Sequence, residues 1–438
     1  MTTFKEPSLK SDGTVGKLTL AEILDTVAGS ELPLHFSAYD GSSTGPADAP
    51  YGLRLKTPRG ATYLATAPGD LGMARAYVSG DLEAVGVHPG DPYEVLKLMD
   101  EGLNFRRPSA KELAAITRSL GWDVLRPIAP PPQEAMPRWR RIAEGLRHSK
   151  TRDADAIHHH YDVSNTFYEY VLGPSMTYTC ACYDHPNQTL EEAQENKYRL
   201  VFDKLRLSAG DRLLDIGCGW GSMVRYAARR GVHVIGATLS REQAEWAQKA
   251  IADEGLSGLA EVRHSDYRDI PESDFDAVSS IGLTEHIGVA NYPAYFGWVK
   301  SKLRDGGLFL NHCITRPDNT QSSKAGDFID RYVFPDGELI GSGRIISDIQ
   351  NIGLEVRHEE NLREHYALTL AEWCKNLVAN WDACVAEVGE GTAKVWGLYM
   401  AGSRLGFERN GVQLHQVLAV KVGPDGNAGL PLRPWWTA

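Results

Sequence analysis

The sequence predicts an α/β protein built on an open, mostly parallel, doubly wound sheet, with a second, smaller α+β domain before it. Two observations predict the sheet: short apolar strands alternate with helical segments from about residue 205, and a glycine-rich turn follows the first strand. The proline-rich stretch 126–132 marks the boundary between the domains. A chain of 438 residues is long enough for both.

Composition and charge exclude several classes of protein. Hydrophobic residues make up 42% of the chain and charged residues 24%, which excludes a disordered chain or a disulfide framework. The net charge of -11 opposes attraction to nucleic acid phosphates, so we expect no nucleic-acid partner. Six scattered cysteines, with no second pair at zinc spacing near Cys180 and Cys182, predict a reducing compartment and no metal site.

The start of the chain has no apolar signal core, and no apolar run approaches the roughly 20 residues that a membrane-spanning helix needs. We therefore expect a cytoplasmic protein whose membrane contact is peripheral, at the inner face. The N-terminal domain, residues 1–125, is expected to hold a helix over 18–28, a strand over 32–38 and a helix over 71–78. Its sequence carries no catalytic signature.

Residues 126–152 are expected to join the domains. The prolines of 126–132 predict an extended linker, and a basic segment follows at 138–150. Trp139, Ile142 and Leu146 stand at helical spacing in this segment. Such a segment suits the surface of an anionic bilayer, and a solvated helix between domains is the alternative. The C-terminal residues 432–436, which include two tryptophans, are a second candidate for membrane docking.

The third region, 153–438, carries the sheet. Its expected strands cover residues 212–216, 232–236, 260–263, 275–281, 307–312 and 413–422. Its expected helices cover residues 221–230, 240–254, 292–303, 368–386 and 393–406.

The first strand of this region runs into a glycine-rich turn. Asp215 ends the strand, and Gly217, Gly219 and Gly221 follow with the spacing Asp-x-Gly-x-Gly-x-Gly. Glycines there permit a tight turn and let a ligand approach the backbone. The spacing differs from the Gly-x-Gly-x-x-Gly fingerprint, although a dinucleotide-dependent dehydrogenase stays open from this motif alone. Asp215 is placed to accept a hydrogen bond from an amino group of the ligand.

Asp266 and Tyr267 follow a later strand. They offer a carboxylate and a flat aromatic ring, and both groups suit an adenine. With these features the sequence resembles the class I methyltransferases that bind S-adenosylmethionine. Many of those enzymes place an acidic residue after the second strand to bind the ribose. This chain instead has Thr238-Leu239-Ser240-Arg241-Glu242-Gln243 at that place.

Further motifs surround this core. Taken alone, each has a plain structural explanation: three consecutive histidines suit a surface, Glu285 with His286 a helix cap, and His312 a satisfied core position. Jointly, over roughly residues 150 to 422, they resemble the cyclopropane-fatty-acid synthase and mycolic-acid methyltransferase family. The motifs lie at residues 157–165, 176–183, 282–288, 310–314 and 365–370.

The resemblance implies two sets of site residues. Those expected to contact S-adenosylmethionine are Tyr178, Thr179, Gly217, Gly219, Thr238, Gln243 and Tyr267, beside Asp215, Gly221 and Asp266 from the motifs above. Those expected to hold a bicarbonate ion are Glu285, His312, Tyr366, Cys180 and Ile314. Cys180 and Ile314 would do so through backbone groups, which disfavours a nucleophilic cysteine.

The implied chemistry explains this site. An isolated alkene is a poor nucleophile, and its attack on a sulfonium methyl group leaves a carbocation within the acyl chain. The pocket must be apolar, must stabilise the cation and must supply a base, for which a small bound anion serves. Proton loss from the new methyl group closes a cyclopropane ring. A hydride shift before that loss gives an exocyclic methylene branch.

Within the family, residues 71–82 and the chain length resemble the actinobacterial branch that converts oleoyl phospholipid into 10-methylene stearoyl lipid, the precursor of 10-methylstearate (tuberculostearate). A cyclopropane synthase, a small-molecule methyltransferase and a non-catalytic lipid-binding protein are the alternatives. We expect a membrane phospholipid as substrate, a partner reductase for a methylene product, and a lipid-binding or homodimer-forming N-terminal domain. Thr284 replaces a frequent phenylalanine of the family, and we expect it to reshape the surroundings of the cation.

Overall fold

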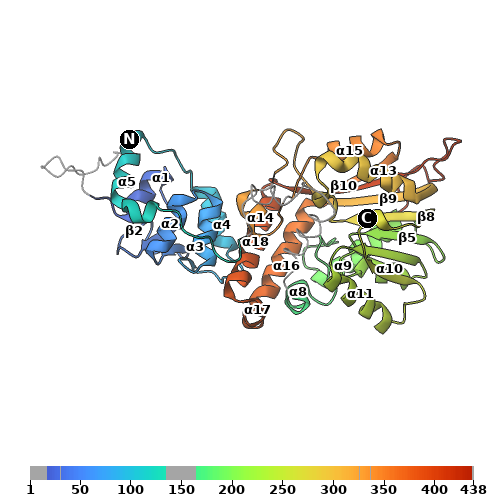
Figure 1. The fold of residues 1–438 in the computed structure, drawn as a ribbon, viewed down its shortest axis with the longest axis horizontal. Helices are drawn as coiled ribbons and strands as arrows, with labels where there is room; N and C mark the ends of the chain where they lie inside the picture. The colour runs from blue at the N-terminus through green and yellow to red at the C-terminus, as the bar shows by residue number, and fades with distance from the viewer. Residues whose placement is uncertain (1–16, 30, 135–163, 325, 336, 437–438) are drawn as a thin grey trace. The chain divides into compact units, whose positions relative to one another are not determined.

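The computed structural model describes residues 17–29, 31–134, 164–324, 326–335 and 337–436 (Figure 1). The chain divides into two compact units. The first comprises Met1–Gln133 with Lys394–Leu398, and the second comprises the remaining residues. The first unit therefore extends past residue 125, where the sequence places its boundary. Tyr63 Oη donates to the Ala129 carbonyl over 2.9 Å, which holds the start of the expected linker on this unit.

The first unit holds a four-stranded sheet in the order β2-β1-β3-β4, in which β1 and β3 are parallel and the other pairs antiparallel. Thr19 caps the first helix with Glu22 in a capping box, in which each side chain accepts from the backbone N–H of the other residue. The strands are β1 (His35–Ala38), β2 (Ser43–Thr44), β3 (Gly52–Leu55) and β4 (Leu82–Val85). The helices are α1 (Leu20–Ala28), α2 (Pro58–Thr66), α3 (Asp70–Val78), α4 (Tyr93–Gly102) and α5 (Ala110–Leu125).

The second unit holds a seven-stranded sheet in the order β10-β11-β9-β8-β5-β6-β7. The expected parallel, doubly wound arrangement is confirmed, with β11 antiparallel to both of its neighbours. The strands are β5 (Arg212–Ile216), β6 (His233–Thr238), β7 (Ala260–His264), β8 (Phe275–Ile281), β9 (Leu303–Thr315), β10 (Glu355–Asn361) and β11 (Gln413–Val420).

Helices surround this sheet and the cavities at its edge. The first half supplies α8 (Asn165–Leu172), α9 (Leu190–Lys204), α10 (Ser222–Ala228), α11 (Arg241–Asp253), α12 (Thr284–Ile287) and α13 (Tyr292–Lys302). The second half supplies α14 (Asp327–Tyr332), α15 (Ser342–Asn351), α16 (Arg363–Ala379), α17 (Trp381–Val388) and α18 (Glu390–Glu408).

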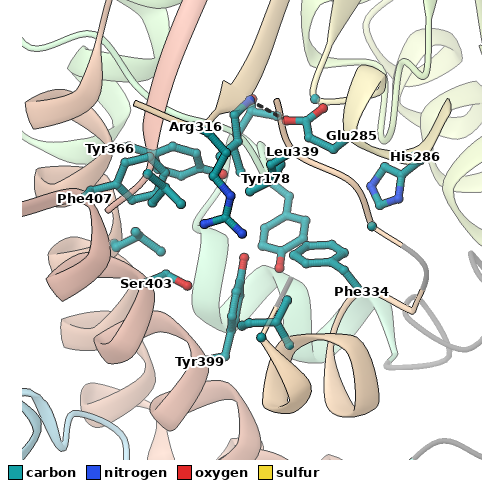
Figure 2. A pocket seen from close by; sticks show the side chains of 18 residues that line it. Tyr178, Glu285, His286, Arg316, Phe334, Leu339, Tyr366, Tyr399, Ser403 and Phe407 are labelled. Carbon is teal, nitrogen blue, oxygen red and sulfur yellow. Dashed lines mark hydrogen bonds between the residues drawn. The ribbon is translucent and has the colours of Figure 1, made fainter. Parts of the chain in front are cut away.

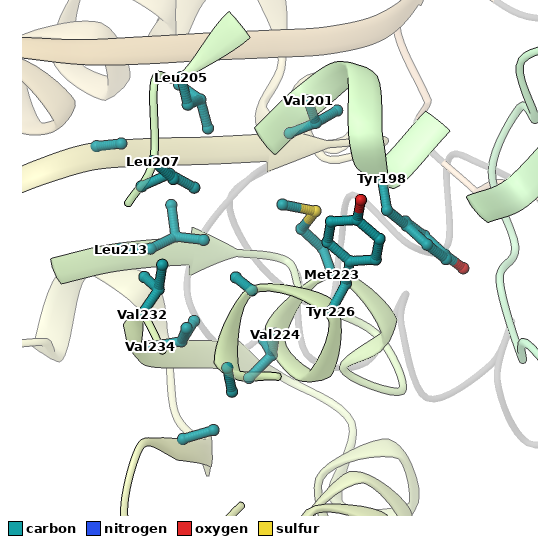
Figure 3. Packing of buried hydrophobic residues seen from close by; sticks show 14 of the residues in the cluster. Tyr198, Val201, Leu205, Leu207, Leu213, Met223, Val224, Tyr226, Val232 and Val234 are labelled. Atoms are coloured by element: carbon teal, nitrogen blue, oxygen red, sulfur yellow. The ribbon is translucent and has the colours of Figure 1, made fainter. Parts of the chain in front are cut away.

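Two apolar clusters fix the strands in place. One packs α9, α10 and α11 onto the sheet around Leu213 and Val224, both wholly buried (Figure 3). The other packs α13 and α15 onto it around Phe296 and Ile349. Burial of this apolar surface is the main stabilising contribution to the fold. The arrangement leaves the carboxyl ends of β5, β6 and β8 at one edge, where open α/β sheets bind ligands.

The C-terminal tail lies on the second unit. Trp435 Nε1 donates to the Asp203 carbonyl over 2.7 Å, and both Trp435 and Trp436 pack against the first apolar cluster. Leu432 is 99% exposed. These two indoles, expected from the sequence as candidates for membrane contact, thus already pack on the protein. Among the described residues, no helix is both long enough and apolar enough to span a membrane.

Candidate active site

Two adjoining cavities lie beside the carboxyl ends of the strands. The smaller, about 80 Å³, is lined by the glycine-rich turn, and we refer to it as the cofactor pocket. The larger, about 180 Å³, is lined mainly by apolar and aromatic side chains, and we refer to it as the acceptor cavity. Tyr178, Thr179 and Gly282 line both. A ligand in one cavity therefore lies next to a ligand in the other.

The three glycines of the turn have separate roles. Gly217 and Gly219 line the cofactor pocket with φ angles of 71° and 54°, and a Cβ at Gly219 would meet open space. Gly221 begins α10 with φ 72°, and a Cβ there would lie 3.2 Å from Ala247 Cβ. Gly221 is outside the lining, so its backbone serves helix packing.

Asp215 and Lys197 are buried on the wall of the cofactor pocket. Ser279 Oγ donates to Asp215 Oδ1 over 2.6 Å, and burial raises the pKa of this carboxyl to about 7. Lys197 Nζ donates to Thr179 Oγ1 over 2.9 Å, and burial lowers its pKa to about 7. Asp215 thus lines the pocket in which we expect it to accept a hydrogen bond from an amino group. Lys197 holds the Thr179 side chain that both cavities share.

Thr238 and Gln243 behave as a pair. Thr238 Oγ1 at the end of β6 donates to Gln243 Oε1 over 2.8 Å. Gln243 lies in the first turn of α11 and lines the cofactor pocket, whereas Thr238 does not. The structure therefore places Gln243 to contact a ligand and Thr238 to orient it.

Asp266 and Tyr267 lie outside the lining of the cofactor pocket. The Arg268 guanidinium binds both carboxylate oxygens of Asp266, over 2.7 Å and 2.5 Å. Tyr267 packs edge to face against Tyr295 and Trp298. The structure does not bring these two side chains to the pocket where the sequence expects an adenine, because neighbouring groups already engage them.

The acceptor cavity is aromatic on several sides (Figure 2). Tyr178 stacks near Phe334 with ring centroids 6.5 Å apart, and Tyr366 lies 4.6 Å from the ring of Phe407. The aliphatic part of the lining is Ile314, Ile329, Leu339, Leu370 and Val412. A lining of this composition accepts an aliphatic chain.

Glu285 lies where β9 meets this cavity. Its Oε1 accepts from the Ile314 backbone N–H over 2.6 Å, and its buried Oε2 has no partner. Burial raises the pKa of this carboxyl to about 7, so it is protonated far more readily than an exposed glutamate. The Ile314 N–H, expected to face the ion, is engaged by Glu285 in this structure.

His312 is 1% exposed and is not itself part of the cavity lining. Its Nδ1 lies 3.2 Å from Gln416 Nε2, and its buried Nε2 has no partner. Burial, followed by the charges of Lys197 and Lys204, lowers its pKa well below the usual 6.5. The imidazole is therefore neutral at physiological pH.

The other residues expected around the ion are Tyr366 and Cys180. Tyr366 in α16 lines the acceptor cavity. Cys180 is wholly buried, and burial raises the pKa of its thiol well above the usual 9. A thiol with a raised pKa is a poor nucleophile. Cys180 is outside the lining of both cavities.

The buried polar groups of Glu285 and His312 fit a small oxyanion. Glu285 Oε2 and His312 Nε2 are buried polar atoms without partners, and such atoms cost stability unless a ligand or water satisfies them. A neutral imidazole N–H and a readily protonated carboxyl both donate hydrogen bonds to an anion. Among the described residues no cluster of histidine, cysteine and carboxylate side chains suits a metal ion.

Several residues that line the cavities are not predicted from the sequence. Lys197 lies on α9, whose capping box, Thr189 with Glu192, is the signal that could have located this helix. Arg316 reaches into the acceptor cavity (Figure 2). Its Nη2 donates to the Lys324 carbonyl over 2.9 Å. Its position two residues after Ile314, just beyond the end of β9, was the available signal.

A further expectation, on Thr284, changes, and two others concern residues beyond those described. Thr284 is outside the cavity lining, since its Oγ1 donates to Asn311 Oδ1 over 2.5 Å within the protein. Any effect of Thr284 on the surroundings of a cation in the cavity is therefore indirect. The histidine run 158–160 and the basic segment 138–150 lie outside the described residues.

Comparison with known proteins places the chain among lipid-modifying methyltransferases. Residues 148–417 match the model of the family described as mycolic acid cyclopropane synthetase. The chain is 71% identical over 424 residues to the probable fatty acid methyltransferase Rv3720 of Mycobacterium tuberculosis, covering 97% of this chain and 99% of the relative. It is 31% identical over 410 residues to the tuberculostearic acid methyltransferase UfaA1 of the same organism, covering 90% and 89%.

Solved structures give the same family. The cyclopropane synthase MmaA2 from Mycobacterium tuberculosis superposes with a TM-score of 0.58 at 30% identity, covering 62% of this chain and 99% of that one. The mycolic acid cyclopropane synthase CmaA1, complexed with SAH and CTAB, superposes with a TM-score of 0.58 at 31% identity, covering 61% and 98%.

Proposed function

The chain belongs to the mycolic acid cyclopropane synthetase family of S-adenosylmethionine-dependent methyltransferases, and from this premise we propose that its methyl acceptor is the double bond of an unsaturated acyl chain in a membrane phospholipid. The acyl chain we propose is oleoyl, and the product is 10-methylene stearoyl lipid. Relatives named as fatty acid and tuberculostearic acid methyltransferases support an acyl acceptor.

The observation that carries the proposal is the apolar acceptor cavity, which shares a wall with the cofactor pocket. Tyr178, Thr179 and Gly282 form that wall. The cavity offers aliphatic and aromatic surface to the acceptor, which favours a hydrocarbon over a polar amine or hydroxyl.

The side chains of this site can perform two tasks. When bound, S-adenosylmethionine supplies an electrophilic methyl group and bicarbonate supplies a small base. The rings of Tyr178, Phe334 and Tyr366 line or flank the acceptor and stabilise positive charge on it through their negative faces. His312 and Glu285 supply the two unpartnered polar atoms that would hold the ion.

A cyclopropane lipid is the second candidate product. Two solved cyclopropane synthases support it at 30% and 31% identity, whereas UfaA1 supports the methylene product at 31% identity over a larger share of this chain. A 10-methylene lipid retains a carbon–carbon double bond, so its conversion to 10-methylstearate requires a separate reductase.

The test is methylation of dioleoyl phospholipid vesicles with isotope-labelled S-adenosylmethionine, followed by mass spectrometry of the released fatty acids. The proposal expects label in a product that takes up hydrogen on mild catalytic hydrogenation. A labelled product that resists hydrogenation is the cyclopropane, and label absent from lipid overturns the proposed substrate.

A matched pair of variants ties the reaction to the site. His312→Gln should abolish most of the lipid labelling, because it removes the buried imidazole expected to hold the ion. His233→Gln should retain it, since His233 is exposed at the start of β6, at the opposite end of the strands from the site. Equal activity of the two variants would contradict the role of His312.

A further inference from the structure

A chain of hydrogen bonds leads from a buried lysine to the buried imidazole. Lys204, at the end of α9, is wholly buried and forms an ion pair with Glu360 of β10. Its Nζ also donates to Gln416 Oε1 on β11 over 2.8 Å. Gln416 Nε2 lies 3.2 Å from Nδ1 of His312 on β9. Four elements that are distant in sequence thus meet in one polar network.

The chemistry of this network fixes the direction of each hydrogen bond. Lys204 Nζ faces two oxygen atoms, the Glu360 carboxylate and the Gln416 amide oxygen, and both require a donor. The amide oxygen of Gln416 therefore faces the lysine, and its NH2 group faces His312. Because that NH2 group can only donate, Nδ1 of His312 must accept.

A neutral imidazole that accepts at Nδ1 carries its proton on Nε2. Burial and the two nearby lysine charges disfavour a second proton on the ring. Nε2 is the ring nitrogen that has no partner and lies buried. The network therefore leaves His312 with one free N–H donor, the form that binds an anion.

The opposite tautomer would be unfavourable at both ring nitrogens. A proton on Nδ1 would point at the NH2 group of Gln416, placing two donors 3.2 Å apart in a buried site. Nε2 would then present a lone pair to an anion. Side-chain partners of this kind orient histidines in metal sites in the same way.

We propose that Gln416 and Lys204 are positioning residues that lock His312 in its Nε2–H tautomer, and that this lock gives the site its affinity for the bicarbonate ion. The inference rests on the proposed function, in which His312 holds that ion. Neither residue lines either cavity, so each acts through His312 and not on a substrate.

The first test reads the tautomer directly and needs no substrate. Nitrogen-15 NMR at pH 8 of protein labelled in its histidines, with His312 assigned by loss of its signals in His312→Gln, should show Nε2 protonated and Nδ1 bare. An Nδ1–H tautomer in the wild-type protein overturns the proposal. Because the measurement omits lipid and cofactor, failure of the proposed methylation would leave its result unaffected.

The second test measures the consequence for ion binding. In Gln416→Leu, which removes the donor to Nδ1, bicarbonate binding followed by carbon-13 NMR should weaken by about tenfold to a hundredfold. The affinity for S-adenosylmethionine should stay within about twofold. Gln413→Leu is the matched control, because Gln413 lies on the same strand and its side-chain NH2 group donates to Asn410 Oδ1, away from His312.

A second variant covers the case in which Gln416→Leu fails to fold. Glu360→Gln removes the carboxylate that favours protonation of the buried Lys204. A neutral amine can accept as well as donate, so the orientation of Gln416 is no longer fixed and bicarbonate binding should weaken by a smaller factor. The proposal is overturned if folded Gln416→Leu binds bicarbonate as tightly as the wild type. It is also overturned if Glu360→Gln changes the tautomer of His312 but leaves the bicarbonate affinity unchanged.

Discussion

At the scale of single residues, the glycines of the glycine-rich turn have two different roles: some permit a strained backbone, and some let a ligand approach the backbone. Gly219 and Gly221 both have positive φ, so alanine at either costs roughly 1–2 kcal/mol of stability. We expect Gly219→Ala to weaken S-adenosylmethionine binding more than Gly221→Ala, because only Gly219 lines the cofactor pocket. We expect Gly221→Ala to lose more stability, since its Cβ would press on Ala247.

Isothermal calorimetry and urea denaturation on both variants check this crossed pattern. Gly255→Ala serves as control for strain alone, because Gly255 has φ 70° with open space around its Cβ position and lies outside both cavities. Equal losses of cofactor affinity in Gly219→Ala and Gly221→Ala would contradict the separation.

Glu285 predicts a pH-dependent stability. Its pKa is raised from 4.5 to about 7, so protonation favours the folded state; this contribution is complete below pH 4.5 and is lost as the pH rises through 7. Glu285→Gln, neutral at every pH, should therefore gain stability over the wild type by roughly 2 kcal/mol more at pH 8 than at pH 5.

Denaturant unfolding at both pH values measures this difference, with Glu245→Gln on the exposed face of α11 as the control. If Glu285→Gln gains the same free energy of unfolding at pH 5 and at pH 8, burial does not raise the pKa of Glu285 in the wild type. Lipid methylation by the variant should be largely retained, because the amide oxygen can accept from Ile314 N–H and the NH2 group can donate to an anion, as a protonated carboxyl does.

At the scale of elements, α9 carries three residues that hold the site. Gln194 Nε2 donates to the Thr179 carbonyl over 3.0 Å, Lys197 holds the Thr179 side chain, and Lys204 begins the network to His312. The helix starts in the capping box formed by Thr189 and Glu192. Its stability and the geometry of the site are therefore linked.

Thr189→Ala should lower the free energy of unfolding by about 1 kcal/mol, because it leaves a backbone N–H of the first turn without its acceptor. Urea denaturation measures the change. Ser347→Ala is the control: its exposed hydroxyl in α15 bonds a carbonyl one turn earlier and caps no helix end, so a similar loss there would contradict the capping explanation.

The elements predicted correctly from sequence are those with a simple burial pattern. β5 and β8 match the expected 212–216 and 275–281, because continuous apolar runs next to glycines mark central strands. β10 was missed, since it alternates exposed and half-buried residues in a charged sequence. α9 was missed because Lys197 and Lys204, buried through specific partners, have the polarity of surface residues.

The site was predictable where local sequence motifs carry its residues. Tyr178, Gly217, Gly219, Gln243, Glu285 and Tyr366 lie on the cavities as the motifs indicate. Asp266 lies outside the lining of the cofactor pocket, and the Arg268 guanidinium binds its carboxylate. The partners of His312 come from β11 and α9, and no local sequence pattern encodes contacts at such separations.

At the scale of the whole molecule, the substrate we propose lies in a membrane, whereas the protein carries a net charge of -11. A negative protein is repelled by an anionic bilayer, so docking requires a local positive region. The C-terminal indoles pack on the second unit and contribute no charge. The basic segment 138–150, outside the described residues, is the region whose sequence meets this requirement.

We therefore expect neutralisation of four arginines in this segment, Arg138, Arg140, Arg141 and Arg147, to weaken binding to vesicles that contain anionic lipid. Each basic residue near such a surface contributes about 1 kcal/mol, an attraction that acts within a Debye length of about 10 Å at 0.1 M salt. Co-sedimentation should thus show a larger loss at low salt than at high salt, and little loss with neutral vesicles. Methylation of a detergent-dispersed lipid should persist, because the cavities are untouched. If vesicle binding is unchanged by the substitutions and by salt, the docking face lies on another part of the chain. The charge of this segment then has no role in membrane binding.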